Sequence, residues 1–293
     1  MRAVGAALCV VRRVDRAAGH GECNRRRRVA LSLRSQGLCP HAMRDAQRAA
    51  ARRLPPLLTR CRSRKIEGGF PTPIRCLRMT PEQRKSASEA RIQSLDIPIN
   101  EALPPRAADS DIQLRSPEEV LQRMIALWSV VGSAMMPGNR HFHRYIVANR
   151  YQTWLSEREM RFLLKEKPGE SQRIQYSWQL EPLYFIGWCA GLIERIEIPK
   201  GPSSLKDIVD LFPKDIAPPD RLKAAIRMRS TAEIMDQVDL VYRLDWGLRN
   251  SAPTSGDTPP AVNAGVIQEW HRAANWMIRH KGQDNWDHIE IGA

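Results

Sequence analysis

The feature that most constrains this chain is an abrupt change of composition near Met79. Residues 1–78 contain 19 basic side chains, 18 of them Arg, against four acidic ones, whereas residues 79–293 contain 27 basic and 28 acidic side chains. All eight Trp, all five Tyr and four of the five Phe lie after residue 78. The formal net charge of +14 therefore belongs to the first segment, and only the second has the large apolar side chains that a core needs.

Residues 1–78 combine many Arg side chains with a single aromatic residue, Phe70. Such a segment cannot bury enough apolar surface to offset the entropy lost on ordering, so we expect it to be disordered. A secretory signal, an organelle transit peptide and a nucleic-acid-binding arm are alternatives, but Arg12 and Arg13 follow the apolar stretch at once, Ser is scarce and stacking aromatics are missing. A further alternative is that Met79 is the true start and that the preceding part is a translation of GC-rich DNA.

Residues 79–293 have the length and composition of one domain with a sizeable core. No apolar run approaches the roughly 18 residues needed to span a bilayer, so no membrane segment is expected. The single thiol, Cys189, excludes a disulfide framework and a zinc site built from Cys, and it favours a reducing cytoplasm. The nearly neutral charge of this part argues against its binding nucleic acid.

Three helix starts are indicated by local capping signals, in which a Ser or Thr cap is followed three positions later by Glu or Gln. These signals lie at Thr80, Ser116 and Ser156. The stretch 97–114, between the first two helices, is interrupted by Pro and is predicted to be an extended linker. After Ser116, apolar residues recur at the three- and four-residue spacing of a buried helical face, namely Val120, Met124, Leu127, Trp128 and Val131.

The longest apolar-rich segment, 171–194, predicts a central helix or helix pair with kinks at Pro182 and Gly187. A last long helix is expected at about 261–280. No alternating run bounded by hairpin turns is present. The sequence therefore predicts an all-α fold, a single domain of about seven to nine helices.

Distinctive segments recur in order through this domain: IPIN at 97–100, the helix at 114–131, WQLE and the residues after it at 178–191, RSTAEIMDQVDLVYRLDWGLR at 229–249, and 266–276 with Trp286-Asp287. These segments resemble an uncharacterised bacterial family, the domain-of-unknown-function family numbered 4272. The resemblance covers nearly all of 79–293 and none of 1–78. It implies a shared domain and no particular biochemical activity.

Seven polar residues stand among Trp, Tyr and aliphatic side chains on the predicted helices, namely Glu181, Arg229, Asp239, Arg243, Glu269, His271 and Asn275. Buried charges must be paired, so this set predicts either a structural ion-pair network or a pocket between helices. In a pocket, Glu181 or Asp239 would act as base and His271 as proton shuttle, while the Arg side chains would hold an anionic ligand.

Motifs for other chemistries are missing from residues 79–293. His141 and His143 lack the acidic partners of a metal motif, and we expect them to lie in a surface loop, with His280 and His288 also exposed. Neither a Gly-rich phosphate loop nor a nucleophile elbow occurs. We therefore expect no cofactor and no metal, and a domain that binds another protein or a small anionic ligand without catalysis. The alternative is an enzyme that uses the Glu/Asp/His/Arg cluster.

Overall fold

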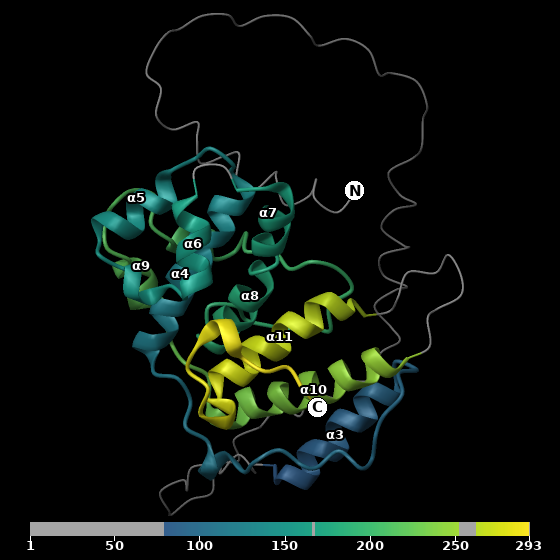
Figure 1. The fold of residues 1–293 in the computed structure, drawn as a ribbon. Helices are drawn as coiled ribbons and strands as arrows, with labels where there is room; N and C mark the ends of the chain where they lie inside the picture. Colours follow the sequence, from purple (N-terminus) through teal and green to yellow (C-terminus); the bar gives the residue numbers. More distant parts are fainter. Residues whose placement is uncertain (1–78, 166–167, 252–261, 293) are drawn as a thin grey trace, which may run out of the picture. The chain divides into compact units, whose positions relative to one another are not determined.

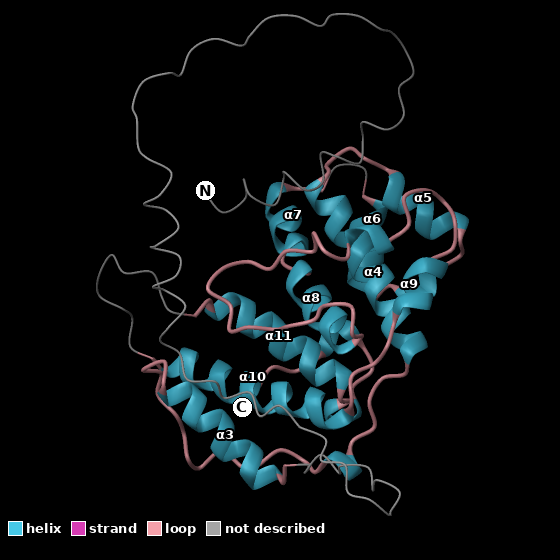
Figure 2. Cartoon of the chain, turned by 180° about the vertical axis from the view of Figure 1, so that it is seen from behind, coloured by secondary structure: helices cyan, strands magenta, loops and turns pink. Residues whose placement is uncertain are grey.

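The computed structural model describes residues 79–165, 168–251 and 262–292, and these contain helices and no strand (Figures 1 and 2). The all-α prediction is confirmed, and the number of α-helices in this part of the chain lies within the predicted seven to nine. The predicted disorder of residues 1–78 lies outside the described residues. No helix among the described residues is long and apolar enough to cross a membrane.

The first helices begin where their capping signals predicted. They are α3 (Pro81–Gln93), α4 (Pro117–Met135) and α6 (Glu157–Leu164). In each, the hydroxyl of the N-cap residue accepts a hydrogen bond from a backbone N–H one turn into the helix, and the Gln or Glu at that position accepts one from the N-cap N–H. These reciprocal bonds satisfy backbone donors that have no partner within the helix.

The apolar segment at 171–194 forms a helix pair, α7 (Glu170–Ser177) and α8 (Leu180–Cys189). The chain breaks between them at residues 178–179, and Pro182 and Gly187, where kinks were predicted, both lie inside the continuous helix α8. Pro182 is in the first turn of α8, where its missing N–H removes no bond of the helix. A Cβ at Gly187 would lie 3.3 Å from side-chain atoms of Ile193 and Ile208, so this Gly permits close packing.

Two helices were not predicted, α5 (His141–Ala148) and α9 (Asp220–Ala225). The expected surface loop at His141 and His143 is therefore wrong. Between these two residues, Phe142 is buried, and a Cβ on Gly132 of α4 would overlap its ring. The buried residues of α5, Phe142, Tyr145 and Ile146, stand at the three- and four-residue spacing of one helical face, a local signal that the prediction of a loop overlooked.

Helix α8 contacts both α4 and α11 (Ala264–Met277), and α11 also contacts α10 (Thr231–Asn250), which in turn contacts α3 (Figure 1). Helix α4 packs against α5, α6 and α7 as well. The shared core runs through these contacts and includes most of the buried apolar side chains. Figure 2 shows the same arrangement of helices from behind.

The stretch 97–114, predicted as a linker, is packed against α3 and α10. Arg84 of α3 is buried and bonds Asp109 of this stretch at 2.6 Å and Asp236 of α10 at 2.8 Å. A Cβ at Gly247 would lie 2.6 Å from the carbonyl oxygen of Pro98, so only Gly fits there. These contacts fix the backbone that carries Arg106.

Candidate functional site

The seven polar residues singled out from the sequence do not form one cluster. Asp239, Arg243, His271 and Asn275 lie where α10 and α11 face each other and the stretch 97–114, and each is buried. Glu181 and Glu269 form a second group between α8 and α11. Arg229 belongs to a third location, beyond the end of α8.

Arg229 holds the chain that leaves α8. Its Nε donates to the carbonyl of Trp188 at 2.9 Å, and its Nη2 donates to the carbonyls of Ile193 at 2.9 Å and Glu194 at 2.7 Å. Its guanidinium also lies 4.7 Å from the ring centre of Trp188. A cation that satisfies carbonyls at the C-terminal end of a helix stabilises that end. This arrangement is structural and leaves few donors for a ligand.

Glu181 is 2 % exposed, and one of its carboxylate oxygens accepts a hydrogen bond from the backbone N–H of Ser203 at 2.9 Å. Burial raises the pKa of Glu181, and repulsion from Glu269 adds to the rise, while Ser203 and the nearby Trp270 indole oppose it. Burial likewise raises the pKa of Glu269, against the effect of Arg272. Two acids with raised pKa values therefore share one apolar interface.

His271 is fully buried, and its Nδ1 lies 2.7 Å from Oδ2 of Asp245 on α10. Burial lowers the pKa of His271 and nearby Arg106 and Arg249 act in the same direction, while Asp245 opposes them. The neutral ring therefore donates its Nδ1–H to Asp245. Its Nε2 is buried without a hydrogen-bond partner among the described residues.

The proposed catalytic pairing of Glu181 with His271 is not assembled in this structure. Trp270, the neighbour of His271 on α11, packs against Tyr184 and Phe185 of α8, whereas His271 contacts Tyr242 and Asp245 of α10. Successive residues of a helix project in different directions. The acid and the imidazole therefore lie on different sides of α11.

Asp239 and Arg243, both on α10, form a buried ion pair, with Nε and Nη2 of the guanidinium donating to the two carboxylate oxygens at 3.0 and 3.1 Å. Arg243 also donates to the carbonyls of Leu103 at 3.3 Å and Pro104 at 2.9 Å. This pair thus anchors the backbone two residues before Arg106.

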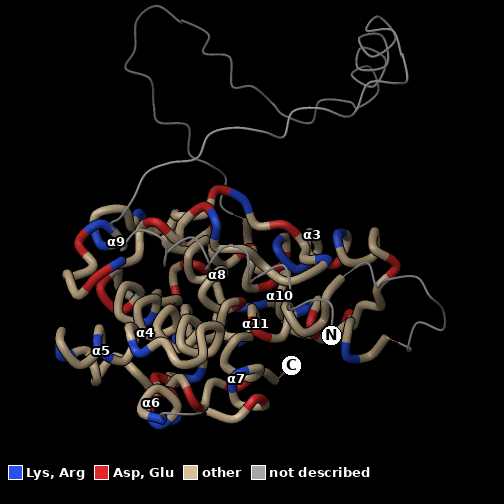
Figure 3. Tube along the Cα trace, turned by 90° about the horizontal axis from the view of Figure 1, so that it is seen from above, with Lys and Arg blue, Asp and Glu red and all other residues tan. Residues whose placement is uncertain are grey.

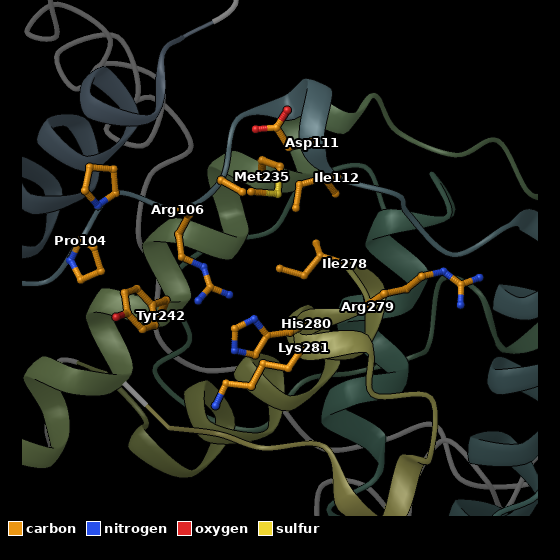
Figure 4. A pocket seen from close by; sticks show the side chains of 12 residues that line it. Pro104, Arg106, Asp111, Ile112, Met235, Tyr242, Ile278, Arg279, His280 and Lys281 are labelled. Atoms are coloured by element: carbon orange, nitrogen blue, oxygen red, sulfur yellow. The ribbon is translucent and has the colours of Figure 1, made fainter.

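A cavity of about 340 Å³ opens beside this anchor, and we call it the Arg106 cavity. It is lined by residues 104–107 and 111–112, by Met235 and Tyr242 of α10, and by residues 278–281 after α11. In Figure 4 the guanidinium of Arg106 lies between Tyr242 and His280 and faces the cavity. The side chain of Arg279 extends away from it.

Arg106 is half-buried and is held by uncharged partners. Its guanidinium carbon lies 4.6 Å from the ring centre of Tyr242, and its Nη2 donates to Oδ1 of Asn275 at 3.0 Å. The amide of Asn275 in turn donates to the carbonyl of Glu290 at 2.7 Å, which fixes its orientation. Burial lowers the pKa of Arg106, and Arg243 contributes to the lowering, against Tyr242 and Asp239. No carboxylate lies within ion-pair distance of Arg106 in the part of the chain that the structure describes.

The opposite wall of the cavity carries His280 and Lys281. Burial lowers the pKa of His280 to about 4, and Arg106, Lys281 and His271 add to the lowering. Lys281 pairs with Glu290 at 2.6 Å. Arg279 and Lys281 have φ values of 51° and 55°, in the left-handed region that non-Gly residues seldom adopt. The expectation that His280 is exposed is wrong, because its side chain is half-buried at the wall of the cavity, whereas His288 is exposed as expected.

The described residues contain no group of three or more His, Cys, Asp or Glu side chains arranged to hold a metal ion. Cys189 is free and fully buried, and burial raises the pKa of its thiol. A buried thiol of this kind is inert as a nucleophile or metal ligand.

A family model described as a domain of unknown function, DUF4272, matches residues 84–289. The chain belongs to this family. The resemblance inferred from the sequence is thereby confirmed, and the matched span includes every residue that lines the Arg106 cavity. No curated protein and no solved structure gave a significant match to the chain.

None of the residues that line the cavity of this DUF4272 domain is among the seven site residues predicted from the sequence; Asn275, which is, bonds Arg106 from behind. Arg106 was assigned to a linker because Pro104 and Pro105 precede it. Two signals were available. Pro104 and Pro105 restrict the backbone that leads to Arg106, and the run Arg279-His280-Lys281 concentrates basic residues just after the last long helix.

Proposed function

We propose that residues 79–293 form a non-catalytic binding domain that takes a small anion in the Arg106 cavity. The observation that carries this proposal is a half-buried guanidinium that faces a cavity without a carboxylate partner among the described residues. His280 and Lys281 supply further donors on the opposite wall.

A charge that loses part of its hydration needs compensating partners. The guanidinium of Arg106 has five N–H groups, and one of them is used by Asn275. Its Nε and Nη1 groups have no acceptor among the described residues. A bound anion would supply these acceptors and the missing negative charge, and such charge-assisted hydrogen bonds are stronger than neutral ones.

Two other classes of function receive less support. Glu181 and His271 lie on different sides of α11, so an enzyme built on that pair lacks a common site. The alternative base, Asp239, is bonded through both carboxylate oxygens to Arg243, whereas His271 bonds Asp245. Figure 3 shows basic and acidic residues interspersed along the described helices, which favours neither a nucleic-acid surface nor a single charged face. In the part of the chain that the structure describes, the large exposed apolar side chains are spread over several elements; they are Val147, Leu164, Ile174, Trp178 and Ile216.

We further propose that the domain boundary lies near Met79 and that the protein works in a reducing bacterial cytoplasm, which the buried free thiol of Cys189 supports. A fragment of residues 79–293 should unfold cooperatively and as stably as the full chain, and cell fractionation should recover the protein with cytoplasmic markers. A fragment that fails to fold, or a protein found outside the cytoplasm, would contradict these two proposals.

The function is tested by isothermal titration of the full chain with inorganic phosphate, acetate, phenyl phosphate and phenylacetate. We expect saturable binding of at least one anion, weakened roughly tenfold to hundredfold by Arg106→Gln, because a hydrogen bond to a charged group contributes about 1.5–3 kcal/mol. The matched control is Arg161→Gln, which removes a charge from an exposed ion pair on α6. Binding that survives Arg106→Gln, or no binding of any anion, would refute the proposal.

A further inference from the structure

We infer that the Arg106 cavity selects a monocarboxylate that carries an apolar body, such as an aryl- or alkyl-substituted acetic acid. This inference rests on the proposed function and deepens it by naming the class of ligand. It follows from the number of cations at the cavity that lack a carboxylate partner among the described residues, and from the apolar character of the remaining wall.

The cavity has one cation without a carboxylate partner among its described lining residues, and this is Arg106. Arg279 bonds Glu119 at 2.6 Å and points away from the cavity, while Lys281 bonds Glu290 at 2.6 Å. The acidic lining residue, Asp111, is exposed, and water screens its charge. One negative charge on a ligand would therefore balance the site.

His280 adds a hydrogen-bonding group without adding charge at neutral pH. The groups that face it are Arg106 of the stretch before α4, Lys281 and Glu290 of the C-terminal segment, and His271 of α11. Burial and the positive neighbours keep its pKa at about 4, so the ring is neutral at pH 7. A phosphate dianion would bring a second negative charge, and the described lining residues offer no second cation without a carboxylate partner to balance it. A planar carboxylate instead suits the fork of a single guanidinium.

Most of the remaining wall is apolar. Ile112, Pro104 and Pro105 line the cavity, together with Ile278 and Tyr242, which expose little of their surface. Met235 also lines it but is completely buried. A bare acetate would leave much of the 340 Å³ to water. Burial of each additional methylene group increases affinity about fourfold, so an apolar body that reaches this wall should bind much more tightly than the carboxylate alone.

The inference is tested by isothermal titration of the full chain at pH 7.5 with phenylacetate, acetate, phenyl phosphate and phenylacetamide, the last being the uncharged counterpart of the first. We expect phenylacetate to bind at least roughly tenfold more tightly than each of the other three compounds. Arg106→Gln should weaken phenylacetate and acetate alike. Ile112→Ser should weaken phenylacetate and leave acetate unchanged, whereas the control Ile174→Ser, on an exposed face of α7, should change neither.

The possible failures are distinguishable. If phenyl phosphate or inorganic phosphate binds more tightly than phenylacetate, and Arg106→Gln abolishes that binding, the selectivity inferred here is wrong and the proposed function stands. If acetate binds as tightly as phenylacetate, the apolar wall plays no part and the inference is again wrong. If no compound binds, or phenylacetate binds regardless of Arg106, both proposals fail. Circular dichroism of each variant confirms that a loss of binding is not a loss of folding.

Discussion

Replacement of Asp239 by Asn tests whether the buried ion pair on α10 supports the fold and the cavity. Asp239 is completely buried and Arg243 is 3 % exposed, and the two are joined by hydrogen bonds of 3.0 and 3.1 Å. Arg243 also holds the carbonyls of Leu103 and Pro104. Asp239→Asn keeps the shape of the side chain and removes its charge, so the guanidinium stays buried without its main counterion.

The size of the effect follows from these contacts. Breaking a buried pair by removing one partner costs about 3–5 kcal/mol. Glu89 remains 3.4 Å from Nη1 of Arg243, and the Asn amide oxygen still accepts one hydrogen bond, so part of the loss is offset. We therefore expect the free energy of unfolding to fall by about 2–4 kcal/mol, which lowers the melting temperature of a domain of this size by roughly 5–15 °C.

The assay is urea unfolding of the full chain followed by Trp fluorescence, with the midpoint compared at an unchanged slope. The control is Glu157→Gln, which breaks the exposed pair with Arg161 on α6, with side chains 81 % and 67 % exposed. Exposed pairs contribute about 0–1 kcal/mol, so the control should unfold nearly like the wild type.

Two results would refute this reasoning. The first is a loss below about 1 kcal/mol in Asp239→Asn, which would show that the pair is already solvated or compensated. The second concerns the double variant Asp239→Leu with Arg243→Met, which removes both charges and should therefore be less destabilised than Asp239→Asn. A double variant that is more destabilised would mean that hydrogen bonds to Leu103 and Pro104, rather than the charge left without a partner, dominate.

Three further predictions use the same unfolding measurement. Gly132→Ala should destabilise by about 1–2 kcal/mol, because overlap with the Phe142 ring exceeds the gain in helix propensity, and the loss should shrink in a Phe142→Leu background. Glu159→Gln should cost about 3 kcal/mol, because it leaves Arg123 buried without the carboxylate that now lies 2.5 Å away; a loss below about 1 kcal/mol would contradict this. For His280, the pKa is lowered from 6.5 to about 4, so the unfolded chain binds a proton between these pH values and the folded chain does not. Stability should therefore fall as pH drops from 6.5 to 4, and less steeply in His280→Gln; equal slopes would contradict the lowered pKa.

The helix starts could be predicted because they depend on neighbours in sequence. The bonds of each capping box join residues three positions apart, so Thr80, Ser116 and Ser156 carry the signal by themselves. Helix α5 has no capping box, so this signal could not predict it; only the spacing of Phe142, Tyr145 and Ile146 indicates a buried helical face there. The stretch 97–114 contains no α-helix, as its prolines predict, but it is packed rather than free. Arg84 and Arg243, distant in sequence, decide that the stretch is packed.

In the candidate site, too, some features could be predicted from the sequence and others could not. Sequence periodicity correctly indicated that Glu181, Asp239, Arg243, His271 and Asn275 are buried. It could not indicate which helix each one faces, and the side chains of Trp270 and His271 therefore separate toward α8 and α10. Arg106 could not be predicted as a site residue from the sequence. It is distinguished by having no carboxylate partner among the described residues, and only the folded structure shows this.

The central claim is that the guanidinium of Arg106 binds an anion in its cavity. Nuclear magnetic resonance of the full chain observes the Arg106 Nε–H directly, with its signal assigned by its disappearance in Arg106→Lys. We predict that this signal shifts saturably as phenylacetate is added, with the same dissociation constant that calorimetry reports, and that the ring signals of His280 shift in parallel. If calorimetric binding saturates while the Arg106 signal stays unchanged, the anion binds elsewhere and the account is wrong.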